Sequence, residues 1–150
     1  VAPYRFDPPV SPHLAAELAG VEIDAGALPG LARAAGAGAD ALVCEGVGGL
    51  LVPLTYSYLV RDLAADLGLP LVVVADPALG TINHKLLTLE AARDAGLAVR
   101  AVVFSRWPDE PGELERSNRE TVGRLGVVEV LTLPVIDLDD PEGWPRLGLA

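Results

Sequence analysis

The sequence predicts an α/β domain with a doubly wound, mostly parallel sheet, and three observations lead to that fold class. Four short, continuous apolar runs rich in β-branched residues are typical of strands buried on both faces of a parallel sheet. Segments whose apolar residues recur at helical spacing lie between these runs. A glycine stands where each later helical segment gives way to a strand, which favours a left-handed C-terminal cap. Together they indicate repeated strand, helix and strand units.

The expected elements follow from these runs. Strands are expected at residues 41–44, 69–75, 97–104 and 127–133. Helices are expected at residues 58–67, 82–95 and 113–125. The last of these helices should bury Leu114, Val122 and Leu125 along one stripe. The expected left-handed caps are Gly68, Gly96 and Gly126.

The two ends of the chain are expected to be less regular. Residues 1–13 form an irregular, Pro-rich segment, and Ser11-Pro12 is a helix N-cap followed by Pro at the first helical position. Short helices should then span residues 12–19 and 25–35. Residues 137–150 are acidic and rich in Pro and Gly, which favours an extended tail. At 150 residues, the chain is predicted to form one domain.

Composition excludes several classes of function. The net charge of −10 and the pI near 4.5 leave no basic face for nucleic acid and argue against docking on an anionic membrane. No apolar run is long enough to cross a membrane, and no signal peptide is visible. Cys44 is the only cysteine, so no intrachain disulfide can form. These features predict a cytoplasmic protein.

The first candidate site is the segment from residue 41 to residue 54. A predicted strand runs into Glu45, and glycines follow at positions 46, 48 and 49. In open α/β sheets ligands bind beyond the carboxyl ends of strands, and a carboxylate there suits Mg²⁺. Neighbouring glycines let main-chain N–H groups approach a phosphate. The alternative is a tight turn with a solvated Glu45, and this segment alone does not decide between them.

The second candidate is the polar opening of the helix at residues 82–95. Thr81 is the expected N-cap, and a helix start offers unpaired N–H groups with partial positive charge to an anion. The first turn lacks the acidic residue that would complement this charge. The alternative is a plain cap with Asn83 and His84 facing solvent. Taken alone, the stretch favours that alternative.

The third candidate lies at the ends of the last two strands. Ser105-Arg106 ends one of them, and residues 133–137 end the other. Because parallel strands share one carboxyl edge, these segments should converge with Glu45 and Gly80. Other candidates are weaker: His13 and His84 lack partners at metal-ligand spacing, and Cys44 is expected to be buried and inert.

Two motifs in this order resemble those of dethiobiotin synthetase. They are Glu45-Gly46-Val47-Gly48-Gly49 and Gly80-Thr81-Ile82-Asn83-His84, and the opening segment "PYRFDPPVSPHLAA" is also similar to that family. The resemblance covers about Ala2 to Pro134 and implies a P-loop NTPase-like α/β fold and a homodimer. Family members use ATP and magnesium to carboxylate 7,8-diaminononanoate with carbon dioxide or bicarbonate and close the ureido ring of dethiobiotin.

The resemblance also implies roles for individual residues. Glu45 would hold Mg²⁺. The nucleotide would be bound by Glu45, Gly46, Val47, Gly48, Ser105, Arg106, Pro134, Val135 and Ile136. The substrate would be bound, from across the dimer interface, by Gly80, Thr81, Ile82, Asn83 and Asn118.

The chain departs from the family pattern in two places. The GxxxxGK[ST] phosphate loop and the catalytic Lys expected upstream are absent, so the sequence resembles the C-terminal two thirds of a member. Ser105-Arg106 stands where many members carry an Asn that reads the nucleotide base. We expect residues 1–150 alone neither to fold stably nor to turn over ATP. Two alternatives stay open: a non-catalytic relic or partner subunit, and another P-loop ligase or ATPase relative.

Overall fold

The computed structural model describes residues 1–148 and divides the chain into two compact units, Val1–Leu69 and Pro70–Ala150. The assignment of one domain to the whole chain stays a prediction. Residues 149 and 150 of the expected tail lie outside the described residues. Within residues 1–148, no helix is both long and apolar enough to cross a membrane.

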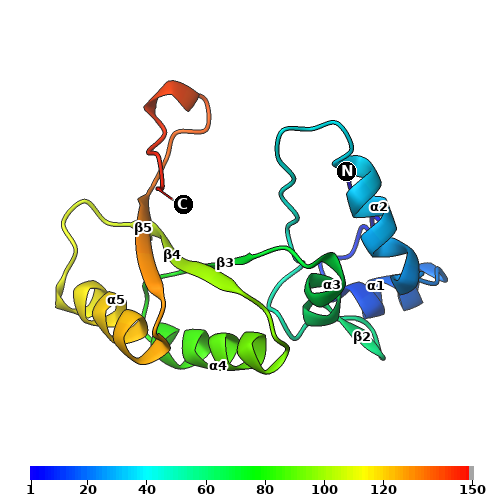
Figure 1. The fold of residues 1–150 in the computed structure, drawn as a ribbon, viewed down its shortest axis with the longest axis horizontal. Helices are drawn as coiled ribbons and strands as arrows, with labels where there is room; N and C mark the ends of the chain where they lie inside the picture. The colour runs from blue at the N-terminus through cyan, green and yellow to red at the C-terminus, as the bar shows by residue number, and fades with distance from the viewer. Residues whose placement is uncertain (149–150) are drawn as a thin grey trace. The chain divides into compact units, whose positions relative to one another are not determined.

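The first unit combines short helices with a small hairpin (Figure 1). Its elements are α1 Pro12–Ala19, η1 Ala25–Ala27, α2 Leu28–Ala35, β1 Pro53–Thr55, β2 Tyr58–Leu59 and α3 Val60–Leu67. Helix α1 begins as predicted, with Ser11 as an extended N-cap and Pro12 in the first turn. The core of this unit is formed by Ala16, Ile23, Leu28, Leu54 and Val60.

The strand predicted at residues 41–44 is wrong. In the structure this run has no strand assignment, and Val43 is 91% exposed. A strand needs a neighbour that satisfies its main-chain N–H and C=O groups. Among the described residues, β1 pairs with β2, and β3 to β5 pair with one another, so no strand lies beside residues 41–44. Cys44 is therefore exposed, contrary to its expected burial.

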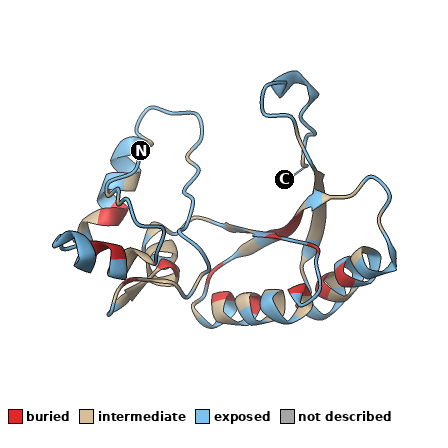
Figure 2. Ribbon diagram, turned by 180° about the vertical axis from the view of Figure 1, so that it is seen from behind, coloured by how far each residue is buried: buried red, intermediate tan, exposed pale blue. Residues whose placement is uncertain are grey.

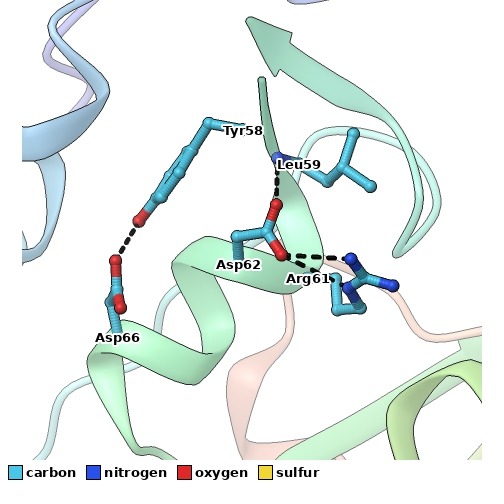
Figure 3. Close-up of polar contacts among 5 residues, drawn as sticks. All are labelled: Tyr58, Leu59, Arg61, Asp62 and Asp66. Carbon is cyan, nitrogen blue, oxygen red and sulfur yellow. Dashed lines mark hydrogen bonds and ion pairs between the residues drawn. The ribbon is translucent and has the colours of Figure 1, made fainter. Parts of the chain in front are cut away.

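Polar contacts fasten α3 to the hairpin of the first unit (Figure 3). The Tyr58 hydroxyl donates to Asp66 Oδ2 at 2.6 Å, and the Leu59 N–H donates to Asp62 Oδ2 at 2.8 Å. The Arg33 guanidinium from α2 donates to the Asp66 carbonyl at 2.5 Å. These contacts join α2, β2 and α3 at the two ends of α3.

Replacing Tyr58 with Phe should change how stability depends on pH. Burial, and then the hydrogen bond to Asp66, raise the pKa of Tyr58 above its usual value of 10. A raised phenol pKa favours the neutral form in the folded state, so its contribution is complete below about pH 10 and is lost at higher pH. Below that pH we expect Tyr58→Phe to cost about 1 kcal/mol.

The measurement is the free energy of unfolding, from urea titration of the complete protein carrying this chain. The difference between wild type and Tyr58→Phe should stay constant below about pH 10 and shrink between about pH 10 and about pH 12. A difference that stays constant over that range would contradict the assignment.

The second unit is a three-stranded parallel sheet covered by helices. Its elements are β3 Leu71–Ala75, α4 Thr81–Asp94, β4 Val99–Trp107, α5 Glu113–Gly126, β5 Glu129–Pro134 and η2 Pro141–Gly143. The strand order is β3-β4-β5 and both pairs are parallel. Figure 1 shows α4 and α5 together on one side of this sheet. The predicted α/β fold class, with its parallel sheet, is confirmed.

The core of the second unit lies between the sheet and the two helices. It is formed by Ala75, Leu89, Val102, Phe104 and Val122. The middle strand β4 is the most buried: Ala101, Val102, Val103 and Phe104 are all buried (Figure 2). At the edge, β3 alternates instead, and Val72 and Val74 are exposed. The continuous apolar run of β3 is therefore covered on one face only.

The buried stripe of α5 differs from the prediction. Asn118, Val122 and Gly126 are buried, whereas Leu114 and Leu125 are exposed. A Cβ built on Gly126 would lie 2.6 Å from Leu89 Cδ1, so glycine allows α5 to approach α4 closely. Gly126 is consequently not the left-handed cap, and Val127 takes that conformation with φ +45°. Gly68 and Gly96 are left-handed, as predicted.

Candidate functional site

The turn between β3 and α4 presents an open helix start. Gly80 is the N-cap and has a left-handed φ of +91°, which a residue with a side chain rarely adopts. The prediction of Thr81 as N-cap is therefore wrong: Thr81 is the first helical residue, and its N–H donates to the Ala78 carbonyl at 3.2 Å. A Cβ built on Gly80 would meet no atom within 4 Å, so the approach to the helix is unobstructed.

The first turn of α4 has the properties of an anion site. Helix geometry leaves the N–H groups of Ile82 and Asn83 without intrahelical acceptors, and the first turn contains no acidic residue. Thr81 is 5% exposed, and its Oγ1 has no hydrogen-bond partner among residues 1–148. A buried hydroxyl without a partner is unfavourable unless a ligand or water supplies one. The side chain of Asn83 is exposed.

The end of β4 lies directly beside the start of this turn. Ser105 Oγ donates to the Ala75 carbonyl at 3.3 Å, and the Arg106 guanidinium lies 3.2 Å from Asp76 Oδ2. The register shifts between Phe104 and Trp107, and Arg106 takes a left-handed φ of +54°. Such a bulge redirects side chains at the end of a strand.

Asp76 connects this bulge to the turn. Its Oδ1 accepts a hydrogen bond from the Ala78 N–H at 3.0 Å, while its other oxygen faces Arg106. Burial lowers the pKa of Lys85, and the Asp76 carboxylate offsets only part of this shift. Neither Asp76 nor Lys85 was among the residues predicted from the sequence. Asp76 carries the signal used for Glu45, an acid directly after a predicted strand, and Lys85 lies one helical turn beyond Thr81.

Asn118 reaches the same turn from α5. Its Nδ2 donates to the Pro77 carbonyl at 2.8 Å and lies 3.4 Å from the Ala78 carbonyl. The second unit thus brings the predicted residues Gly80, Thr81, Ser105, Arg106 and Asn118 around one turn. Pro134 pairs with Trp107 at the end of β5, Val135 is exposed and Ile136 is half-buried.

The glycine loop after Glu45 belongs to the first unit. A Cβ built on Gly46 would lie 2.8 Å from Val60 Cγ1, and Gly48 has a left-handed φ of +73°. The loop is tied to the start of α3, because the Arg61 N–H donates to the Leu50 carbonyl at 2.8 Å. Glycine is therefore required at positions 46 and 48, and Val47 between them is exposed. The predicted convergence of Glu45 with the turn of the second unit stays a prediction.

The single carboxylate at Glu45 fits a magnesium ion whose remaining ligands are waters and substrate phosphates. Glu45 is exposed at the head of the loop. Within the described part of the chain, no group of three or more His, Cys, Asp or Glu side chains could hold a metal alone. Mg²⁺ commonly keeps several waters and binds through one or two carboxylates and the phosphates of a substrate. One exposed carboxylate beside a glycine loop matches that mode of binding.

Comparison with models of protein families identifies the family of this chain. The family model described as "AAA domain" matches residues 1–141. The chain belongs to the AAA-domain family. Membership in this P-loop NTPase-like family confirms the α/β fold class predicted from the sequence. Within the described residues α4 and α5 cover one side of the sheet, so its doubly wound character stays a prediction.

Curated relatives of this AAA-domain chain include proteins named "ATP-dependent dethiobiotin synthetase BioD". The protein from Anaeromyxobacter dehalogenans (strain 2CP-1) is 44% identical over 133 residues, which are 89% of this chain and 60% of the relative. Proteins from Chlorobaculum tepidum and Mycobacterium sp. (strain KMS) are 42% and 40% identical, over 91% and 97% of this chain and 58% and 64% of their own lengths. The resemblance to dethiobiotin synthetase is confirmed, and the chain spans about 60% of the length of these relatives.

Proposed function

We propose that this chain works within an enzyme that uses ATP and Mg²⁺ to convert 7,8-diaminononanoate to dethiobiotin, a step of biotin biosynthesis. The observation that carries the proposal is the start of α4, where no acidic side chain occupies the first turn. Thr81 Oγ1 is buried there and has no partner in the part of the chain that the structure describes. Such a start suits a carboxylate, and 7,8-diaminononanoate carries one. The name shared by the relatives supports the same reaction.

The proposed reaction has three steps. One amine of the substrate adds to carbon dioxide and loses a proton, forming a carbamate. A carbamate oxygen then attacks the γ-phosphorus of ATP, and ADP leaves. The second amine attacks the carbonyl carbon of this mixed anhydride, and phosphate leaves as the ureido ring closes. Such chemistry depends mainly on positioning and on neutralising phosphate charge.

The residues of this chain divide into two groups in the proposal. Gly80, Thr81, Ile82 and Asn83 bind the substrate carboxylate through the main-chain N–H groups and polar side chains of the helix start. The nucleotide is bound by Glu45, Gly46, Val47, Gly48, Ser105, Arg106, Pro134, Val135 and Ile136. Glu45 would hold Mg²⁺, which supplies charge neutralisation at the phosphates.

We also propose a cytoplasmic homodimer in which the helix start serves the partner's substrate. Leu87 lies one turn beyond Asn83 on the same face of α4 and is 55% exposed. A single exposed leucine is common on monomeric proteins, so Leu87 is compatible with a second copy here without indicating one. The homodimer therefore rests on the resemblance to dethiobiotin synthetase.

The direct test is product formation by the complete protein. The purified protein is incubated with ATP, Mg²⁺, bicarbonate and 7,8-diaminononanoate, and dethiobiotin is measured by mass spectrometry alongside phosphate release. Stoichiometric dethiobiotin and phosphate are expected. Phosphate release without dethiobiotin would favour another P-loop ATPase activity, and neither product would favour the non-catalytic alternative.

Replacing Asn83 with Ala tests the substrate site. Loss of a polar contact to the carboxylate should raise KM for 7,8-diaminononanoate about tenfold and leave KM for ATP nearly unchanged. The matched control is Glu90→Ala, an exposed residue farther along α4, which should leave both constants at their wild-type values. An unchanged KM for 7,8-diaminononanoate in Asn83→Ala would remove Asn83 from the site.

A further inference from the structure

We propose that Asn118 is a positioning residue: its buried amide holds the turn that presents the N-terminus of α4, and it does not contact the substrate itself. The inference rests on the proposed function, because it assumes that the substrate carboxylate binds at that helix start. It replaces the direct substrate contact that family resemblance implies for Asn118.

The contacts of the amide point to this role. Asn118 is 4% exposed, and its Nδ2 donates to the Pro77 carbonyl at 2.8 Å. Both nearby partners, the carbonyls of Pro77 and Ala78, can only accept hydrogen bonds. The amide orientation is therefore determined, with the nitrogen toward the turn. A side chain buried and engaged in this way acts on a ligand through the main chain that it holds.

The held turn continues directly into the helix start. The Ala78 carbonyl also accepts from the Thr81 N–H at 3.2 Å, and Gly80 between them is left-handed. Displacement of the Pro77 and Ala78 carbonyls would therefore reorient the N–H groups of the first helical turn. Removing the Asn118 donor leaves the Pro77 carbonyl without this partner in a buried place, which favours such a displacement.

The packing of α5 against α4 determines where the Asn118 amide lies relative to the turn. Val122 and Gly126 continue the buried stripe that Asn118 begins, at spacings of four residues. Gly126 fits against Leu89 of α4, where a Cβ would lie 2.6 Å from Leu89 Cδ1. This close approach fixes the register of α5 against α4. Asn118 is the one polar side chain of that stripe, so packing alone does not account for it.

The test compares Asn118→Ala with Val122→Ala in the complete protein. Val122 is buried one turn farther along the same stripe, so its truncation loses packing without touching the turn. For Asn118→Ala we expect KM for 7,8-diaminononanoate to rise about tenfold, with kcat and KM for ATP within about twofold of wild type. Val122→Ala should lower Tm and leave all three constants within about twofold. Asn118→Asp keeps the side-chain size but loses the donor, and it should raise the same KM.

Hydrogen exchange separates this inference from the proposed function. The amides of residues 78–83 should exchange faster in Asn118→Ala than in Val122→Ala, whether or not the protein makes dethiobiotin. If the protein makes no dethiobiotin, the proposed function fails and the exchange result still decides the role of Asn118. If the protein is active and both Asn118 variants match Val122→Ala in KM and in exchange, the inference is overturned.

Discussion

Replacing Glu45 with Gln in the complete protein is expected to lower kcat for dethiobiotin formation about a hundredfold. The change keeps the size of the side chain but removes the negative charge that would hold Mg²⁺ beside the phosphates. Because Glu45 is exposed and its side chain forms no hydrogen bond or ion pair with residues 1–148, the free energy of unfolding should stay within about 0.5 kcal/mol of wild type. Steady-state kinetics at several Mg²⁺ concentrations give the measurement.

Glu129→Gln is the matched control for this change. Glu129 is an exposed acid at the start of β5, far along that strand from the predicted nucleotide residues. The Glu129→Gln substitution should leave kcat and its dependence on Mg²⁺ concentration unchanged. A Glu45→Gln enzyme with the turnover and Mg²⁺ dependence of the control would show that Glu45 is a solvated turn residue.

Replacing Phe104 with Ala is expected to lower the free energy of unfolding by about 3–5 kcal/mol. Phe104 is fully buried in the middle strand, within the core that β4 shares with α4 and α5. Truncation removes apolar burial and leaves a cavity that neighbouring strands cannot fill without moving. Urea titration of the complete protein measures the change.

Leu125→Ala provides the comparison on the same unit. Leu125 belongs to the stripe predicted from the sequence but is exposed on α5, so its loss should cost no more than about 0.5 kcal/mol. Equal costs for the two substitutions would mean that α5 packs through the stripe predicted from the sequence.

The later part of the fold could be predicted because local pattern and tertiary environment agree there. The apolar runs that became β3, β4 and β5 each find a neighbour within this chain. The run at residues 41–44 has the same pattern but no strand beside it among the described residues. An apolar run indicates the capacity to be a buried strand, whereas pairing depends on residues far away in the sequence.

The spacing of apolar residues also predicted the wrong buried face for α5, and the contacts of this helix explain why. Asn118 is buried and donates a hydrogen bond to the Pro77 carbonyl. Gly126 is buried against Leu89, where a larger side chain would not fit. Asn118 and Gly126 are not apolar side chains, so a search for apolar residues at helical spacing does not find them. Leu114 and Leu125 fit that spacing, but both are exposed.

The candidate site was predictable where main-chain geometry defines it. Glycines at 46, 48 and 80 signal close approach or a left-handed turn, and the structure places each in such a position. Asp76 directly follows a predicted strand, as Glu45 does, but no glycine motif accompanies it, and its contacts with the turn and with Arg106 depend on the folded structure. The buried, unpartnered hydroxyl of Thr81 depends on packing that no spacing rule describes.

The exposed side chains of β3 have a practical consequence for handling this segment. Within the described residues β3 pairs with β4 alone, so one row of its N–H and C=O groups is free, and Val72 and Val74 lie exposed along it. A free apolar edge is a template for pairing with other chains. Expressed as an isolated fragment, these residues should therefore aggregate through β3, and a charged residue at Val74 should improve their solubility.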